Sequence, residues 1–180
     1  MRKALFFLGI LSDSDIEWMM GAGDKLEVAP SQILISEGQP VDSMFLVLHG
    51  KLTVFVSAMG NRELARLQCG EVVGEMSFVD SRPPSATVQA LEPSVVLKIP
   101  RSRLQAKLAQ DPPFAARFYR ALAVFLSDRL RGTVAHLGYG KGMDLDNDTV
   151  YGDEIDSDTM DNLSLAGARF DWLQRRLGAV

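Results

Sequence analysis

The chain has 180 residues, of which 47% are hydrophobic and 23% are charged, with a formal net charge of −4. This length fits one domain with an appendage, or at most two small domains, and the apolar fraction is too high for a chain that is disordered throughout. No apolar run approaches the roughly 18 residues that span a bilayer, and a single cysteine, Cys69, favours a reducing, cytoplasmic compartment. Two histidines and one cysteine also exclude a Cys/His zinc site, so we expect no metal.

The first eleven residues contain two basic residues followed by a short apolar run, as a secretion signal does. No small-residue cleavage site follows, and Ser12–Glu17 instead has the acidic residues of a helix start. We therefore favour a buried N-terminal helix over a signal peptide. Ser12 or Asp13 is expected to cap the next helix, whose apolar residues are Ile16, Met19 and Met20.

Short β-rich runs then recur at spacings of about 8–12 residues, each ended by a turn signal. This spacing predicts a closed β-roll or sandwich rather than a sheet of alternating strands and helices. The expected strands are Leu26–Val28, Gln32–Ile35, Ser43–Leu48, Lys51–Ser57, Glu63–Leu67, Ser85–Ala90 and Ser94–Ile99.

From Arg101 the apolar spacing becomes helical. It predicts a short helix over Arg101–Gln110, stopped by two prolines, and a longer one over Phe114–Arg131 that ends at Gly132. The longer helix has a broad apolar stripe, of which we expect the roll to cover about half. A second copy of the chain is expected to cover the rest. The predicted homodimer interface consists of Phe118, Leu122, Phe125 and Leu126.

Charge divides the rest of the chain. Residues 142–161 hold eight acidic residues and no Lys or Arg, which is typical of a solvated linker. We therefore predict a domain over residues 1–131, a glycine-rich joint and acidic linker over 132–161, and an amphipathic helix over 162–180. That helix packs back on its own chain or dimer, docks on a protein partner, or binds a membrane surface. Its predicted docking residues are Leu163, Phe170, Leu173 and Leu177.

The most informative stretch is Gly70–Val88. Gly74-Glu75-Met76-Ser77 is followed by the apolar pair Phe78-Val79, a short loop, and Ser85-Ala86-Thr87-Val88. This order resembles the phosphate-binding cassette of the cyclic nucleotide-binding domain family. The resemblance covers about residues 5–131. It implies an N-terminal helix, an eight-stranded roll over about 24–100, and two helices, B and C, over about 101–131: a mainly β fold with flanking helices.

The resemblance also implies a ligand site for cAMP or cGMP, with no further cofactor required. A cyclic phosphate is expected to bind backbone N–H donors of the cassette. Glu75 is suited to accept from a ribose hydroxyl, or alternatively from amides of its own loop. The implied site residues are Val73, Gly74, Glu75, Met76, Ser77, Arg82, Pro84, Ser85, Ala86 and Thr87.

Pro84 departs from the family pattern, because the family has an arginine at this position. Proline has neither a charge nor an N–H donor. Losing a bidentate arginine is expected to weaken a phosphate ligand by roughly two to four decades. Arg82 corresponds to a basic loop residue of the family, and we interpret it as a solvated side chain rather than a substitute.

Other functions find little support in the sequence. It contains no motif of an activated nucleophile or metalloprotease, so we expect no enzyme. The acidic run at Asp144–Asp148 lacks the glycine and the final glutamate of a calcium loop. The residues after Arg131 lack the basic surface that DNA binding requires. Two hypotheses remain: a regulatory sensor in which a cyclic nucleotide acts on helix C and the tail, and an interaction module whose pocket has lost its nucleotide.

Overall fold

The computed structural model describes residues 7–57, 60, 62–138 and 157–179, with the side chains of 135–138 and 157–163 outside this description. Within these residues, no helix is both long and apolar enough to cross a bilayer. The strands are β1 (Asp24–Val28), β2 (Ile33–Ile35), β3 (Ser43–His49), β4 (Leu52–Val56), β5 (Arg62–Leu67), β6 (Val72–Val73), β7 (Thr87–Ala90) and β8 (Ser94–Pro100). The helices are α2 (Asp13–Ala22), α3 (Glu75–Asp80), α4 (Arg101–Gln110), α5 (Pro112–Gly138) and α6 (Ser157–Arg176).

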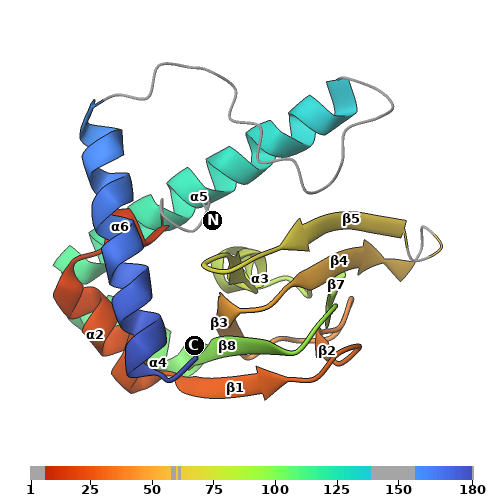
Figure 1. The fold of residues 1–180 in the computed structure, drawn as a ribbon, viewed down its shortest axis with the longest axis horizontal. Helices are drawn as coiled ribbons and strands as arrows, with labels where there is room; N and C mark the ends of the chain where they lie inside the picture. The colour runs from red at the N-terminus through yellow and green to blue at the C-terminus, as the bar shows by residue number, and fades with distance from the viewer. Residues whose placement is uncertain (1–6, 58–59, 61, 139–156, 180) are drawn as a thin grey trace.

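The strands form two four-stranded antiparallel sheets, ordered β1-β8-β3-β6 and β2-β7-β4-β5. Figure 1 shows the sheets as a roll, with α5 extending above it and α2 and α6 beside one another at one end. This is the β-roll with flanking helices that the sequence predicts. Each of the seven expected strands is present. The eighth, β6, has only two residues.

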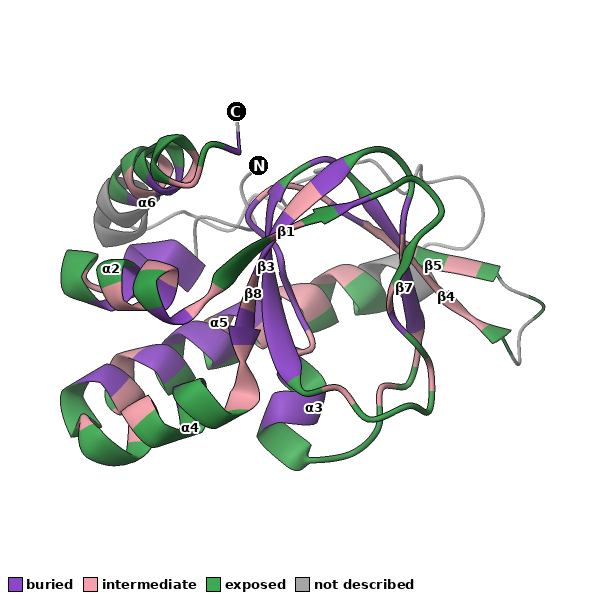
Figure 2. Cartoon of the chain, turned by 90° about the horizontal axis from the view of Figure 1, so that it is seen from below, coloured by how far each residue is buried: buried purple, intermediate pink, exposed green. Residues whose placement is uncertain are grey.

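Strand β3 connects two separate apolar cores. Met44, Leu46 and Leu48 face the core that the helices cover, whereas Phe45 and Val47 face the core between the two sheets. Successive side chains of a strand point to opposite faces. Burial on both faces therefore explains why β3 reads as a continuous apolar run instead of an alternating one. In Figure 2 the ribbon of β3 is correspondingly coloured as buried along most of its length.

Helix α2 begins with the cap that its sequence predicts. The Ser12 hydroxyl accepts from the backbone N–H of Asp15, and the Asp15 carboxylate accepts from the backbone N–H of Ser12. Arg117 of α5 also donates two hydrogen bonds to Asp15, at 2.6 and 2.8 Å. Burial alone would raise the pKa of Asp15, but the hydrogen bonds from Arg117 and Ser12 hold that pKa below its ordinary value. One buried carboxylate thus caps α2 and fixes it to α5.

Helix α5 is longer than the sequence predicts. It continues through Gly132, where we expected its end, to Gly138. Glycine in a helix interior costs only about 1 kcal/mol relative to alanine, so a single glycine need not end a helix. The predicted joint at 132–138 is therefore helical. Residues 157–161 of the predicted linker also belong to α6, and the rest of that linker, 139–156, lies outside the described residues.

The predicted dimer interface requires a correction. Phe118, Leu122 and Phe125 are almost fully buried within their own chain, and Leu126 is partly buried against the same core. The ring of Phe118 makes edge contacts with Phe7, at 5.8 Å between centroids, and with Phe78, at 5.9 Å. Phe7 and α3 thus contact the ring of Phe118, at the start of the stripe that we assigned to a second copy. Phe118, Leu122 and Phe125 are therefore not available as a dimer surface.

The predicted partner-docking face of α6 is likewise buried at its centre. Phe170 and Leu173 lie in the core that covers β3, and Leu177 packs partly against it; the side chain of Leu163 lies outside the described residues. Polar contacts hold the same helix: Arg169 donates to Asp13 at 2.6 Å, and Gln174 donates to the Leu48 carbonyl. Of the alternatives for this helix, the structure has the one in which it packs back on its own chain.

Candidate functional site

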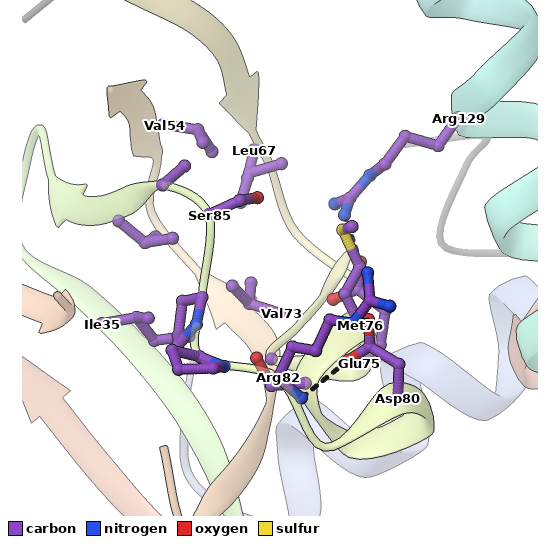
Figure 3. Close-up of a pocket in the computed structure, with 16 residues that line it drawn as sticks. Ile35, Val54, Leu67, Val73, Glu75, Met76, Asp80, Arg82, Ser85 and Arg129 are labelled. Atoms are coloured by element: carbon purple, nitrogen blue, oxygen red, sulfur yellow. Dashed lines mark hydrogen bonds and ion pairs between the residues drawn. The ribbon is translucent and has the colours of Figure 1, made fainter. Parts of the chain in front are cut away.

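A pocket of about 240 Å³ lies between α3, the strands of the second sheet and the C-terminal half of α5. Its apolar wall consists of Ile35, Val54, Leu67, Val73 and Val88. Figure 3 shows Ile35, Val54, Leu67 and Val73 on one side of the pocket and Arg129 extending from α5 on the other. Small-molecule sites have this character: concave, mostly apolar and with few polar groups.

Gly74 fixes the start of α3 and with it the position of Glu75. It has a φ of +85°, in the left-handed region that favours glycine. A Cβ at this position would also lie 2.9 Å from the carbonyl oxygen of Ser43 on β3. Both constraints require glycine, so the chain passes close under β3 and then turns the carboxylate of Glu75 inward.

Glu75 is the central polar group of the site. It is 2% exposed, and its Oε1 accepts a hydrogen bond from Arg129 of α5. The Arg129 guanidinium also lies 3.7 Å from a carboxylate oxygen of Glu71, donates to the Val72 carbonyl at 3.4 Å, and lies 4.8 Å from the centre of the Phe125 ring. Burial raises the pKa of Glu75, and the charge of Arg129 opposes that rise. An ion pair therefore joins the cassette to the long helix.

A second contact joins α3 to the helices behind it. Phe78 of α3 packs edge-on against Phe118 of α5, with ring centroids 5.9 Å apart. Arg101, the first residue of α4, donates to the Ser77 carbonyl at 3.1 Å and to the Ser81 hydroxyl at 2.7 Å. Both ends of α3 are thus attached to helices outside the roll. A displacement of α3 would therefore change its contacts with α5.

The end of the cassette is fixed to the turn after β2. The Pro84 carbonyl accepts from the backbone N–H of Gly38 at 2.9 Å, and the Thr87 hydroxyl accepts from the backbone N–H of Glu37 at 3.1 Å. Thr87 is buried and does not line the pocket, whereas Pro84, Ser85 and Ala86 do. Thr87 therefore positions the loop and does not face a ligand directly.

Arg82 lies at the rim of the pocket, as the interpretation of a solvated loop residue predicts. Its side chain is 84% exposed and lies 3.9 Å from Asp80, and its backbone N–H donates to the same carboxylate at 3.0 Å. An exposed pair of this kind contributes little free energy.

The structure brings nine of the ten predicted site residues to one pocket, Thr87 being the exception. Arg129, which also lines it, was not predicted. Its position does carry a signal, because Phe118, Leu122, Phe125 and Arg129 follow at steps of four, three and four. A cation at the next position of a buried stripe needs an acceptor. The sequence alone does not say which carboxylate supplies it.

Comparisons with known proteins agree with this geometry. The family model described as the cyclic nucleotide-binding domain matches residues 25–111. Over 79 residues the chain is 35% identical to the cGMP-dependent protein kinase of Eimeria tenella. The aligned stretch covers 44% of this chain and 8% of that kinase. The match therefore concerns a small part of that enzyme.

Two solved structures show the same fold. A cyclic nucleotide-binding domain from Methylobacillus flagellatus superposes with a TM-score of 0.68 at 23% identity, covering 78% of this chain and 84% of that one. The catabolite activator protein of Thermus thermophilus superposes with a TM-score of 0.60 at 26% identity, covering 71% of this chain and 59% of that one.

Proposed function

We propose that the chain is a regulatory module that binds a small nucleotide-like ligand and relays its presence through α5; the match of residues 25–111 to the cyclic nucleotide-binding domain supports this proposal. cAMP and cGMP are the first ligands to test, since they are the ligands of the family. The relay is proposed to continue from α5 to the tail.

The ion pair between Glu75 and Arg129 is the observation that carries this proposal. Glu75 is the carboxylate that the family resemblance assigns to a ribose hydroxyl. Its present partner is on a different element, α5, which also contacts α3 through Phe118 and Phe78. A ligand that binds Glu75 changes the environment of Arg129, so occupancy of the pocket and the position of α5 are coupled. Coupling of this kind requires that the ligand favour one arrangement over the other.

Pro84 favours the second hypothesis, an interaction module without a nucleotide. It lines the pocket at the position where the family has its phosphate-binding arginine, and it supplies no charge. In that case the Glu75–Arg129 pair would serve only to fix α5 on the roll.

Titration calorimetry of the full chain against cAMP, cGMP, their nucleosides and their linear monophosphates separates the two hypotheses. Hydrogen exchange with and without the ligand that binds then tests the relay. We expect micromolar binding of at least one compound and altered protection on α3 and on the half of α5 that follows Phe125. Binding without any change on α5 would refute the relay, and no binding would leave the interaction module as the function.

A further inference from the structure

We propose that this pocket selects an uncharged nucleoside over the corresponding cyclic nucleotide. The inference rests on the proposed function, because it names the ligand class of the same site. It follows from the charges that line the pocket and from the partners that those charges already have.

The charged side chains among the lining residues are Glu75, Asp80, Arg82 and Arg129, two of each sign. Each arginine has a carboxylate partner: Arg129 has Glu75 and also Glu71, and Arg82 has Asp80. The pocket is thus balanced before any ligand enters. A cyclic phosphate would add a negative charge for which the described lining residues hold no unshared cation.

Arg129 is poorly placed to change partner. If it turned to a phosphate, Glu75 would remain buried at 2% exposure without its cation. A buried charge without a partner is strongly unfavourable, so the gain at the phosphate would be offset at the carboxylate. Arg82 faces the opposite difficulty. Its side chain is 84% exposed, and a charge in that much solvent is screened.

Pro84 removes the remaining source of positive charge at the loop, and it has no backbone N–H to donate. Its carbonyl oxygen already accepts a hydrogen bond from the backbone N–H of Gly38. The neighbouring lining residues Pro83, Ser85 and Ala86 are also without charge. At the loop where the family places its phosphate, the charged donor among the described lining residues is therefore Arg82, which is exposed and already pairs with Asp80.

What remains suits a flat, apolar body that carries hydroxyl groups. Five aliphatic side chains form one wall, and a carboxylate accepts about four hydrogen bonds, of which Arg129 uses a part. Glu75 can therefore accept from a sugar hydroxyl while it keeps its ion pair. The volume of about 240 Å³ is below the roughly 300–1,000 Å³ of most ligand sites, which favours a single nucleoside over a dinucleotide.

Titration calorimetry of the full chain with adenosine, guanosine, cAMP and cGMP tests the inference. We expect a nucleoside to bind more tightly than its own cyclic phosphate, by on the order of tenfold or more. A cyclic nucleotide that binds as tightly as its nucleoside would overturn the inference and leave the proposed function intact. Failure of all four compounds to bind would overturn the inference, and it would overturn the proposed function as well if the linear monophosphates also fail to bind.

The Pro84→Arg variant identifies the cause. It restores a cation where the family has one, so the ratio of cAMP affinity to adenosine affinity should rise on the order of tenfold. Pro83→Arg is the matched control, because it adds the same charge one residue away and should give a smaller gain. An unchanged cAMP affinity in a folded Pro84→Arg variant would show that missing charge does not exclude the phosphate, and the inference would fail.

Discussion

Helices α5 and α6 pack on the same apolar core, but the ion pairs that hold them differ in burial. Arg129 of α5 pairs with Glu75, which is 2% exposed, whereas Arg169 of α6 pairs with Asp13, whose side chain is 79% exposed. Breaking a pair with a buried carboxylate leaves an uncompensated charge, and an exposed pair contributes little. Helix α5 is thus bound to the pocket by charge as well as packing, whereas α6 depends mainly on its apolar side chains.

The largest effect is expected at the apolar face of α5. Phe118→Ala should lower the free energy of unfolding by about 3–5 kcal/mol, because this fully buried ring contacts the rings of Phe7, Phe78 and Phe114. Denaturant unfolding measures the loss. Tyr119→Ala, at a half-exposed neighbour, is the control and should cost much less. Equal effects would mean that Phe118 is not buried in its own chain.

The same burial predicts what happens when two of these residues are replaced by glutamate. A Phe118→Glu, Phe125→Glu double variant is expected to lose cooperative unfolding, since both side chains lie in the core of one chain. A folded, monomeric double variant would restore the interpretation of these residues as a dimer surface. Whether the wild-type chain is a homodimer is a separate measurement, which light scattering of the unmodified protein supplies.

Arg129→Met is expected to cost about 3 kcal/mol at neutral pH, because it leaves Glu75 buried without its cation. The loss should depend on pH. Burial already raises the pKa of Glu75 in the folded state, and removing Arg129 raises it further. The folded state then binds the proton more tightly than the unfolded state, so stability falls as pH rises through the folded pKa.

The deficit of Arg129→Met should therefore be smallest below the unfolded pKa of about 4.3 and largest at neutral pH. Adding Glu75→Gln to the variant should abolish this pH dependence, since the titrating group is gone. Denaturant melts of the wild type and both variants between pH 4 and 8 make the comparison. A deficit independent of pH would contradict the assignment of the ion pair.

Helix α6 should show a smaller effect. Leu173→Ala is expected to cost about 2 kcal/mol, at the low end for a buried leucine, because α6 covers the core from one side. Trp172→Ala, at an exposed neighbour, is the control. Ligand affinity should not change in either variant, because none of the α6 residues whose side chains the structure describes lines the pocket. A change in affinity with Leu173→Ala would indicate that α6 acts on the pocket.

The smallest effect is expected at the exposed ion pair. Asp13→Ala should cost about 0.2–1 kcal/mol, and most of that should disappear at high salt. The contrast is Asp15→Ala, two residues further on, which removes a helix cap and the partner of Arg117 together and should cost several times more. Similar losses for the two variants would erase the distinction between buried and exposed pairs.

Local patterns predicted the elements whose signals lie within a few residues. The Ser12 cap and the end of α4 before Pro112 are examples, because capping and proline act on adjacent backbone groups. The two-residue strand β6 was missed as a run in its own right, since two valines are too short for an alternation to be visible. Gly132 was expected to end α5, because a glycine commonly follows the last residue of a helix. The helix instead continues past it to Gly138.

Contacts between segments far apart in the chain could not be predicted from the sequence. The cassette was found because its residues are contiguous, but the partner of Glu75 lies 54 residues away on another element. The stripe on α5 correctly indicated burial, yet it did not say whether the covering surface belongs to the same chain. The partner that covers the apolar face of α6 was ambiguous for the same reason. An amphipathic helix specifies that one face is covered and leaves its partner open.

The burial of both faces of β3 affects how the molecule unfolds. Its side chains alternate between the core under the helices and the core inside the roll, and its neighbour β8 does the same through Val96 and Leu97. Neither core can be exposed without disturbing the strands that form a wall of the other. The helical layer and the roll are thus expected to share a single cooperative transition, with the slowest amide exchange on β3 and β8.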